Sequence, residues 1–152
     1  MKEPLVSRIL KYALYAVFAA GVVITATLPL MFTTYTYIFF GNVSLREEYI
    51  AFIVPFLMSI GVPCLWIVLE MIWMLRSIPK GPFVIRNVHA LYRIGILFLV
   101  LAAAFAAKCF IFLTFLTLFS AFLFTGGGLF AFTLAALIRQ SIVFREENDL
   151  TI

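Results

Sequence analysis

Charged residues are scarce in this chain, and their scarcity excludes most classes of water-soluble protein. Only 12% of the 152 residues are Asp, Glu, Lys or Arg, whereas a typical soluble domain has about 25%. Apolar residues make up 65% of the chain, and the mean hydropathy is +1.16. A water-soluble core of this size could not bury so much apolar surface, so lipid must be the solvent for most of the protein.

Metal-binding and nucleophilic residue types are also scarce, which argues against an enzyme. The chain has one histidine and two cysteines. His89 has no Cys, Asp or second His near it in the sequence, and Cys64 and Cys109 fall in separate apolar segments without metal-ligand spacing. The two thiols are expected at different membrane depths, too far apart for a disulfide. The sequence therefore predicts no metal, no cofactor and no enzymatic activity.

The longest apolar stretch runs from Ile94 to Ile138, with Lys108 as its single charge. It is roughly twice as long as the ~20 residues with which a helix crosses a bilayer. The stretch therefore predicts two crossings joined by a tight turn near Thr114, and two more spans precede it. We expect one all-α integral membrane domain, a four-transmembrane-helix bundle, with helices at about residues 12–31, 49–75, 92–112 and 117–138.

Proline and glycine residues occur within the first two predicted spans. Pro29 lies near the end of the first span, before a stretch rich in Thr and Tyr that is typical of a membrane interface. Pro55, Gly61 and Pro63 lie within the second span. Because proline removes a backbone donor and clashes with the preceding turn, the second helix is predicted to be kinked.

Basic residues gather on one side of the predicted membrane. Of the 11 lysines and arginines, all but Arg46 and Lys108 fall in the N-terminal segment, the central loop (76–93) or the tail (139–152). Cytoplasmic segments are enriched in Lys and Arg, so both termini and the central loop are predicted to be cytoplasmic. The same bias explains the pI near 9.3, and no direct nucleic-acid binding is predicted.

Two ionisable residues, Glu70 and Lys108, fall inside predicted spans, where a charge is costly. Glu70 matches the depth of Lys11 and Arg93. A pair with either one, or a functional carboxylate, explains Glu70 equally well. Lys108 lies near the outer end of the third helix, where we expect its side chain to snorkel outward. No second ionisable group is expected near mid-bilayer, which argues against a proton-coupled carrier.

Small residues recur at four-residue spacing in the predicted fourth helix, as Gly127, Ala131 and Ala135. Such stripes let helices approach closely in lipid. Packing inside the bundle is the favoured interpretation, and a homo-oligomer seam is the alternative. The run Gly126–Gly128 predicts either a close-packing site, which is simpler, or a local break that lines a cavity.

The tail and the central loop have opposite charge, and both are predicted to lie on the cytoplasmic surface. They could pair with each other, bind a partner, or remain solvated ends with exposed ion pairs worth only ~0–1 kcal/mol. Solvated helix ends would not need the apolar residues that follow the acidic residues of the tail. We therefore favour a tail that docks on another surface. The acidic and apolar tail residues are Glu146, Glu147, Asp149, Leu150 and Ile152.

Two segments resemble a known family. The central loop reads GPFVIRNVHALYRIG from Gly81 to Gly95, and the last eight residues read REENDLTI. Both are similar to the bacterial four-helix membrane family of unknown function typified by YoaS (domain of unknown function 2975). Its members share a Pro-Phe…Asn…Leu…Ile-Gly loop and a Glu-Asn-Asp-Leu-Thr-Ile terminus. The matching positions here are Pro82, Phe83, Asn87, Leu91 and Gly95 in the loop and residues 147–152 in the tail.

The resemblance implies a location in the plasma membrane of a bacterium and no enzymatic activity. It also implies a habitual genomic neighbour, a very small helix-turn-helix regulator. The leading hypothesis is therefore a non-enzymatic membrane protein that sequesters or controls such a transcription factor through its loop and tail. The alternative is a small transport, immunity or lipid-binding membrane protein with a cavity near Gly126, Pro63 and Glu70. The predicted partner-binding residues are Pro82, Phe83, Asn87, Leu91, Arg93, Glu146, Glu147, Asp149, Leu150 and Ile152.

Overall fold

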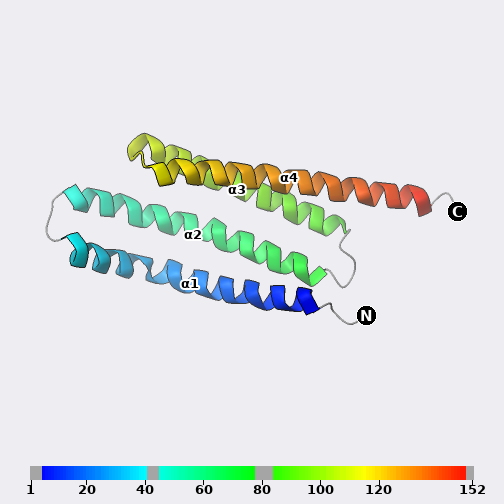
Figure 1. Ribbon diagram of the computed structural model, residues 1–152, viewed down its shortest axis with the longest axis horizontal. Helices are drawn as coiled ribbons and strands as arrows, with labels where there is room; N and C mark the ends of the chain where they lie inside the picture. The colour runs from blue at the N-terminus through cyan, green and yellow to red at the C-terminus, as the bar shows by residue number, and fades with distance from the viewer. Residues whose placement is uncertain (1–4, 41–44, 78–83, 150–152) are drawn as a thin grey trace.

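The computed structural model describes residues 5–40, 45–77 and 84–149 and is all-helical there, as predicted. The helices are α1 (Leu5–Phe40), α2 (Leu45–Ser77), α3 (Ile85–Ile111) and α4 (Phe115–Asp149) (Figure 1). Each contains a segment long and apolar enough to cross a membrane: Ser7–Met31, Ile50–Ser77, Ile85–Ile111 and Phe115–Arg145. The fold is that of a multi-pass membrane protein.

The helices extend further than the apolar runs. α1 continues through Pro29 to Phe40, so this proline does not end the helix. α3 begins at Ile85 instead of near Tyr92, and α4 reaches Asp149. Hydropathy marks where a helix meets lipid, whereas the helix itself continues through Arg, Glu and Gln, which are good helix formers.

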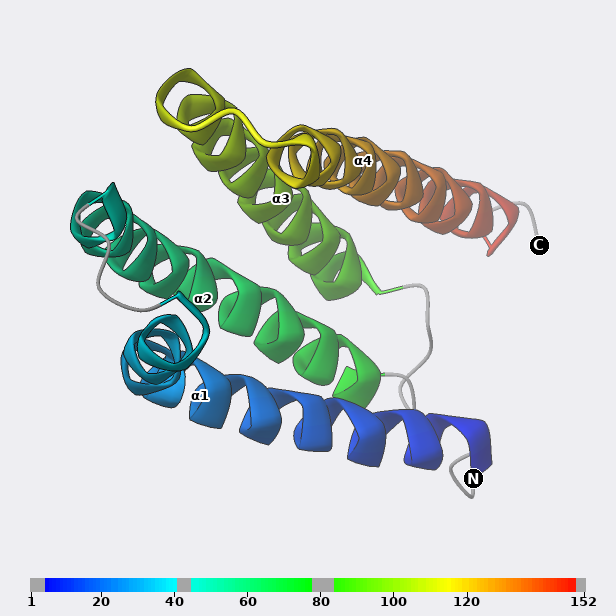
Figure 2. The same cartoon turned by 60° about the vertical axis from the view of Figure 1, so that its left-hand side comes forward.

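The helices run antiparallel, and each one packs only against its neighbours in the chain. Within the described ranges, α1 contacts α2, α2 contacts α3, and α3 contacts α4 most extensively. Figure 2 shows the resulting open layer, with α1 and α4 at its two edges. The predicted turn near Thr114 is confirmed, and it joins α3 to α4 as a hairpin. We call the end of the layer that holds this turn the turn end, and the opposite end, near both termini, the terminal end (Figure 1).

The hydrophobic core lies along α3, which contributes buried residues to both of its clusters. Its main cluster joins Ile60 and Ile67 of α2, Ile94 and Leu101 of α3, and Ala131 of α4. A second cluster, nearer the terminal end, has buried side chains from α3 and α4 only. The apolar residues of both clusters come from helix faces that meet a neighbour, while the remaining apolar faces are left for lipid.

Small residues let α4 approach α3 closely, as the packing interpretation predicts. Ala131 and Ala135 are 4% and 0% exposed. A Cβ at Gly128 would lie 3.1 Å from the Gly95 carbonyl oxygen, so the two backbones nearly touch at this crossing. The shorter alanine pairs in α1 and α3 are exposed instead: Ala16, Ala20, Ala103 and Ala107.

Exposed hydroxyl groups are satisfied within their own helices. Thr34 donates a hydrogen bond to the Leu30 carbonyl oxygen at 2.8 Å, and Thr133 donates one to Leu129 at 2.9 Å. Lipid offers no hydrogen-bond partner, so a hydroxyl on a lipid-facing surface must bond to the preceding turn. These threonines therefore fit a membrane-facing surface despite their polarity.

Candidate functional site

A bidentate ion pair joins α2 to α3 toward the terminal end. Arg93 Nε lies 2.6 Å from Glu70 Oε1, and Arg93 Nη2 lies 2.9 Å from Oε2. The Glu70 side chain is only 2% exposed, whereas that of Arg93 is 51% exposed. Of the alternatives that the sequence left open for Glu70, the structure shows the pair with Arg93. The carboxylate holds two helices together, with Trp66 Nε1 also 3.4 Å away.

Further polar contacts join neighbouring helices at the same end of the layer. The Ser77 hydroxyl lies 2.6 Å from Asn87 Oδ1 and so links the end of α2 to the first turn of α3. Arg76 Nε donates to the Tyr15 hydroxyl at 2.9 Å, which links α2 to α1. Asn87 is 4% exposed, so its amide is committed to the interior. We call Glu70, Arg93, Ser77 and Asn87 the α2–α3 clasp.

Several residues of the loop motif therefore support the fold and lie away from the surface. Asn87 belongs to the clasp, Leu91 packs against Ala135 in the second core cluster, and Gly95 lies at the close crossing with α4. Arg93 is half exposed but holds Glu70. Pro82 and Phe83 lie outside the described residues.

The tail continues α4 past the start of α3, and Figure 1 shows this end projecting beyond the layer. The last residues of α4 that pack on the α3 core include Ile138 and Ile142. Beyond them Phe144, Arg145 and Glu147 are exposed. The side chains of Glu146 and Asp149, and the whole of Leu150–Ile152, lie outside the described part of the chain.

Lys108 corrects one expectation, because it does not snorkel outward. It is 8% exposed and buried near the turn end. Its Nζ donates to the Thr117 hydroxyl at 3.1 Å and lies 5.6 Å from the centre of the Phe56 ring. The hairpin brings Thr117 of α4 beside Lys108, and this nearby oxygen turns the ammonium inward.

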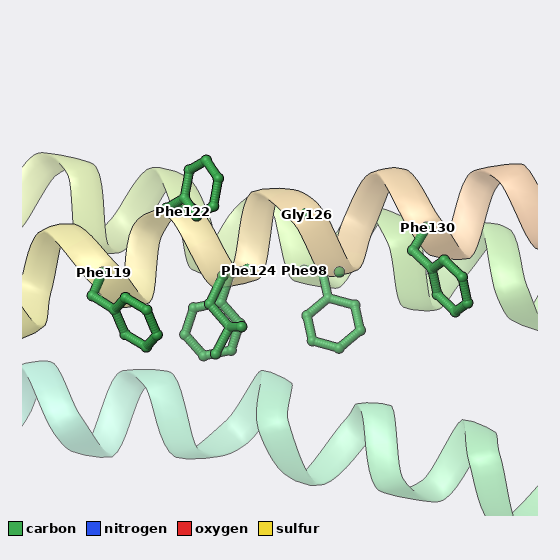
Figure 3. Close-up of a pocket in the computed structure, with 8 residues that line it drawn as sticks. Phe98, Phe119, Phe122, Phe124, Gly126 and Phe130 are labelled. Carbon is green, nitrogen blue, oxygen red and sulfur yellow. The ribbon is translucent and has the colours of Figure 1, made fainter.

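The glycine run serves two purposes along an unbroken α4. Gly128 packs on Gly95, whereas a Cβ at Gly126 would meet nothing within 4 Å. Gly126 instead lines an apolar hollow of about 520 Å³ among phenylalanine side chains, which we call the Gly126 hollow. Figure 3 shows Phe98, Phe119, Phe124 and Phe130 extending to the side on which α2 runs, while Phe122 points away. Pro63 and Glu70 are not among its lining residues.

Sequence reasoning missed the hydroxyl partners of the charged residues. Tyr15, Ser77, Thr114 and Thr117 are ordinary polar residues in apolar segments, with no motif of their own. Only Thr117 had a usable signal: in a hairpin that turns near Thr114, it faces the last turn of α3, where Lys108 lies.

Within the described ranges, no group of three His, Cys, Asp or Glu side chains is placed to hold a metal ion. The cysteines Cys64 and Cys109 are free thiols. The candidate features are therefore the α2–α3 clasp, the projecting end of α4, and the surroundings of Lys108. Comparison of this chain with protein-family models, curated proteins and solved structures found no match.

Proposed function

We propose that this protein is a non-enzymatic membrane anchor that recruits a small cytoplasmic regulator of the helix-turn-helix class to the projecting end of α4. The observation that carries the proposal is the exposed continuation of α4 beyond its packing on α3. A helix that served only to span the membrane and pack would have no need of this charged extension. In the proposed orientation, the terminal end faces the cytoplasm.

Charge supports a basic partner. The end of α4 carries exposed Glu147, and the sequence places Glu146 and Asp149 beside it. DNA-binding modules present a basic surface to phosphate groups. An acidic helix end therefore offers such a module the same sign of charge as DNA, and binding here would withdraw the regulator from its operator.

Rigidity of the scaffold supports the same proposal. The α2–α3 clasp and the Arg76–Tyr15 contact tie together three helices at the terminal end. α4 in turn packs on the first turns of α3 through Ala135 and its neighbours. The projecting end is thus held by a fixed base, which lowers the conformational entropy lost when a partner binds.

The test is truncation of residues 146–152 in the full chain. We expect the truncated protein to insert and fold normally, because the core contacts of α4 end near Ile142. Its recruitment of a co-expressed small helix-turn-helix regulator should fall at least about tenfold. Co-purification from membranes, with circular dichroism as the check on folding, measures both.

A second pair of variants, one that reverses an acidic charge and one that removes a basic charge, supplies the matched control. Glu147→Lys should weaken recruitment and make the remaining recruitment less sensitive to salt, whereas Arg139→Gln, also exposed on α4, should leave recruitment unchanged or strengthen it. Undiminished recruitment by the truncated protein would refute the proposal. Equal losses in Glu147→Lys and Arg139→Gln would argue against an acidic recognition surface.

A further inference from the structure

Hydrogen-bond donors outnumber acceptors around Lys108, which is buried beside the buried Thr117 and the exposed Thr114. Its ammonium has three N–H groups, of which one donates to Thr117 Oγ1 at 3.1 Å. The hydroxyls of Thr114 and Thr117 lie 2.5 Å apart and share one hydrogen between them, so one hydroxyl hydrogen remains. Among the described residues no carboxylate pairs with Lys108. Two N–H groups and one O–H group therefore have no acceptor from the described protein.

These groups border a hollow of about 430 Å³ between α2, α3 and α4, which we call the Lys108 hollow. Its polar lining residues are Lys108, Thr114, Thr117 and Ser120, and its apolar walls include Phe56 and Phe105. α4 begins at Phe115, so the partial positive charge of its N-terminus acts on the same region. A cationic, donor-rich end and aromatic walls suit an anion that carries an apolar group.

The apolar part of such a ligand has a continuation along α4. Phe105 of the Lys108 hollow contacts Phe124 of the Gly126 hollow, with ring centres 5.3 Å apart. Gly126 lies nine residues beyond Thr117, about 14 Å along the helix. The missing side chain at Gly126 leaves open space at that depth. An acyl chain that starts near Lys108 would run down this aromatic face toward the terminal end.

We infer that the Lys108 hollow binds the phosphate of an anionic glycerophospholipid from the leaflet at the turn end, with one acyl chain in the Gly126 hollow. The ammonium and the leftover threonine hydroxyl donate to the phosphate oxygens as charge-assisted hydrogen bonds. The ligand supplies the negative charge that an intramembrane lysine requires. This inference concerns the opposite end of the layer from the proposed recruitment surface and does not depend on it.

The experiment uses the full chain, purified in neutral detergent and stripped of lipid. Phosphatidylglycerol and phosphatidylcholine with identical acyl chains are added, and native mass spectrometry counts the retained lipid while thermal unfolding reports stabilisation. We expect about a tenfold preference for phosphatidylglycerol. Lys108→Met should abolish this preference, Lys108→Arg should keep most of it, and Arg139→Gln, a cation at the terminal end, should keep all of it.

A second variant keeps the test decisive if Lys108→Met does not fold. Gly126→Leu fills the proposed acyl position and should lower retention of both lipids, since nothing nearby obstructs the new side chain. Equal retention of the two lipids by the unaltered protein would overturn the inference. So would unchanged retention in Gly126→Leu, or displacement of phosphatidylglycerol by inorganic phosphate alone, which would identify a free-anion site.

Discussion

Replacing Arg93 by methionine is expected to destabilise the protein by about 2–3 kcal/mol. The change leaves the Glu70 carboxylate, 2% exposed, without its bidentate partner. Breaking a fully buried ion pair costs about 3–5 kcal/mol, and the half-exposed Arg93 side chain places this pair somewhat below that range. Equilibrium unfolding in mixed micelles, followed by circular dichroism, measures the loss.

The partner variant should have a smaller effect. Glu70→Gln leaves a guanidinium that is already half exposed and can turn to water, so we expect a loss of about 1 kcal/mol. Replacing both residues by apolar side chains, Glu70→Leu with Arg93→Met, should restore much of the stability. Equal losses in the two single variants would show that burial of Glu70 does not govern the energetics of the pair.

Two positions of one glycine run, Gly126 and Gly128, should respond differently to the same substitution. Gly128→Leu is expected to cost about 1–3 kcal/mol through overpacking. A Cβ at this position already lies 3.1 Å from the Gly95 carbonyl oxygen, and a backbone atom cannot move aside as a side chain can. The hairpin of α3 and α4 would have to widen at its closest crossing. Thermal unfolding in detergent reports the effect.

Gly126 provides the matched control within the same helix. Gly126→Leu should leave stability unchanged, and Gly126→Ala should raise it by up to about 1 kcal/mol, because alanine has the higher helix propensity and the space is open. If Gly126→Leu destabilises the protein as much as Gly128→Leu does, the space beside Gly126 is not open in the folded protein.

The membrane spans were predictable because hydropathy integrates over many residues. Each span exceeds the length that a bilayer demands, and no soluble alternative could bury the same apolar area. The hairpin turn was predictable for a related reason, since a largely apolar stretch of 45 residues with one charge is too long for a single crossing. The helix ends at Phe40 and Asp149 were not predictable from hydropathy, because the helices continue beyond their apolar segments.

The side-chain partners depended on which helices are neighbours, which composition does not determine. Sequence depth alone allowed Glu70 to pair with Lys11 or Arg93. α2 packs against both α1 and α3, and the structure shows Arg93 of α3 as the partner of Glu70. Snorkelling was expected of Lys108 from its position near a helix end, but the hairpin places Thr117 within hydrogen-bond distance and turns the side chain inward.

By itself the sequence determined that the chain forms four helices long and apolar enough to cross a membrane, because this follows from the length of its apolar stretches. The tertiary structure alone decided the partners of Glu70, Ser77 and Lys108, because each contact depends on an atom from another helix. It turned the loop-motif residue Asn87 toward the end of α2, and it divided the glycine run between a close crossing and an open hollow. Scarcity of charge thus predicts the environment of this protein, and the pairing of the remaining charges gives it a specific architecture.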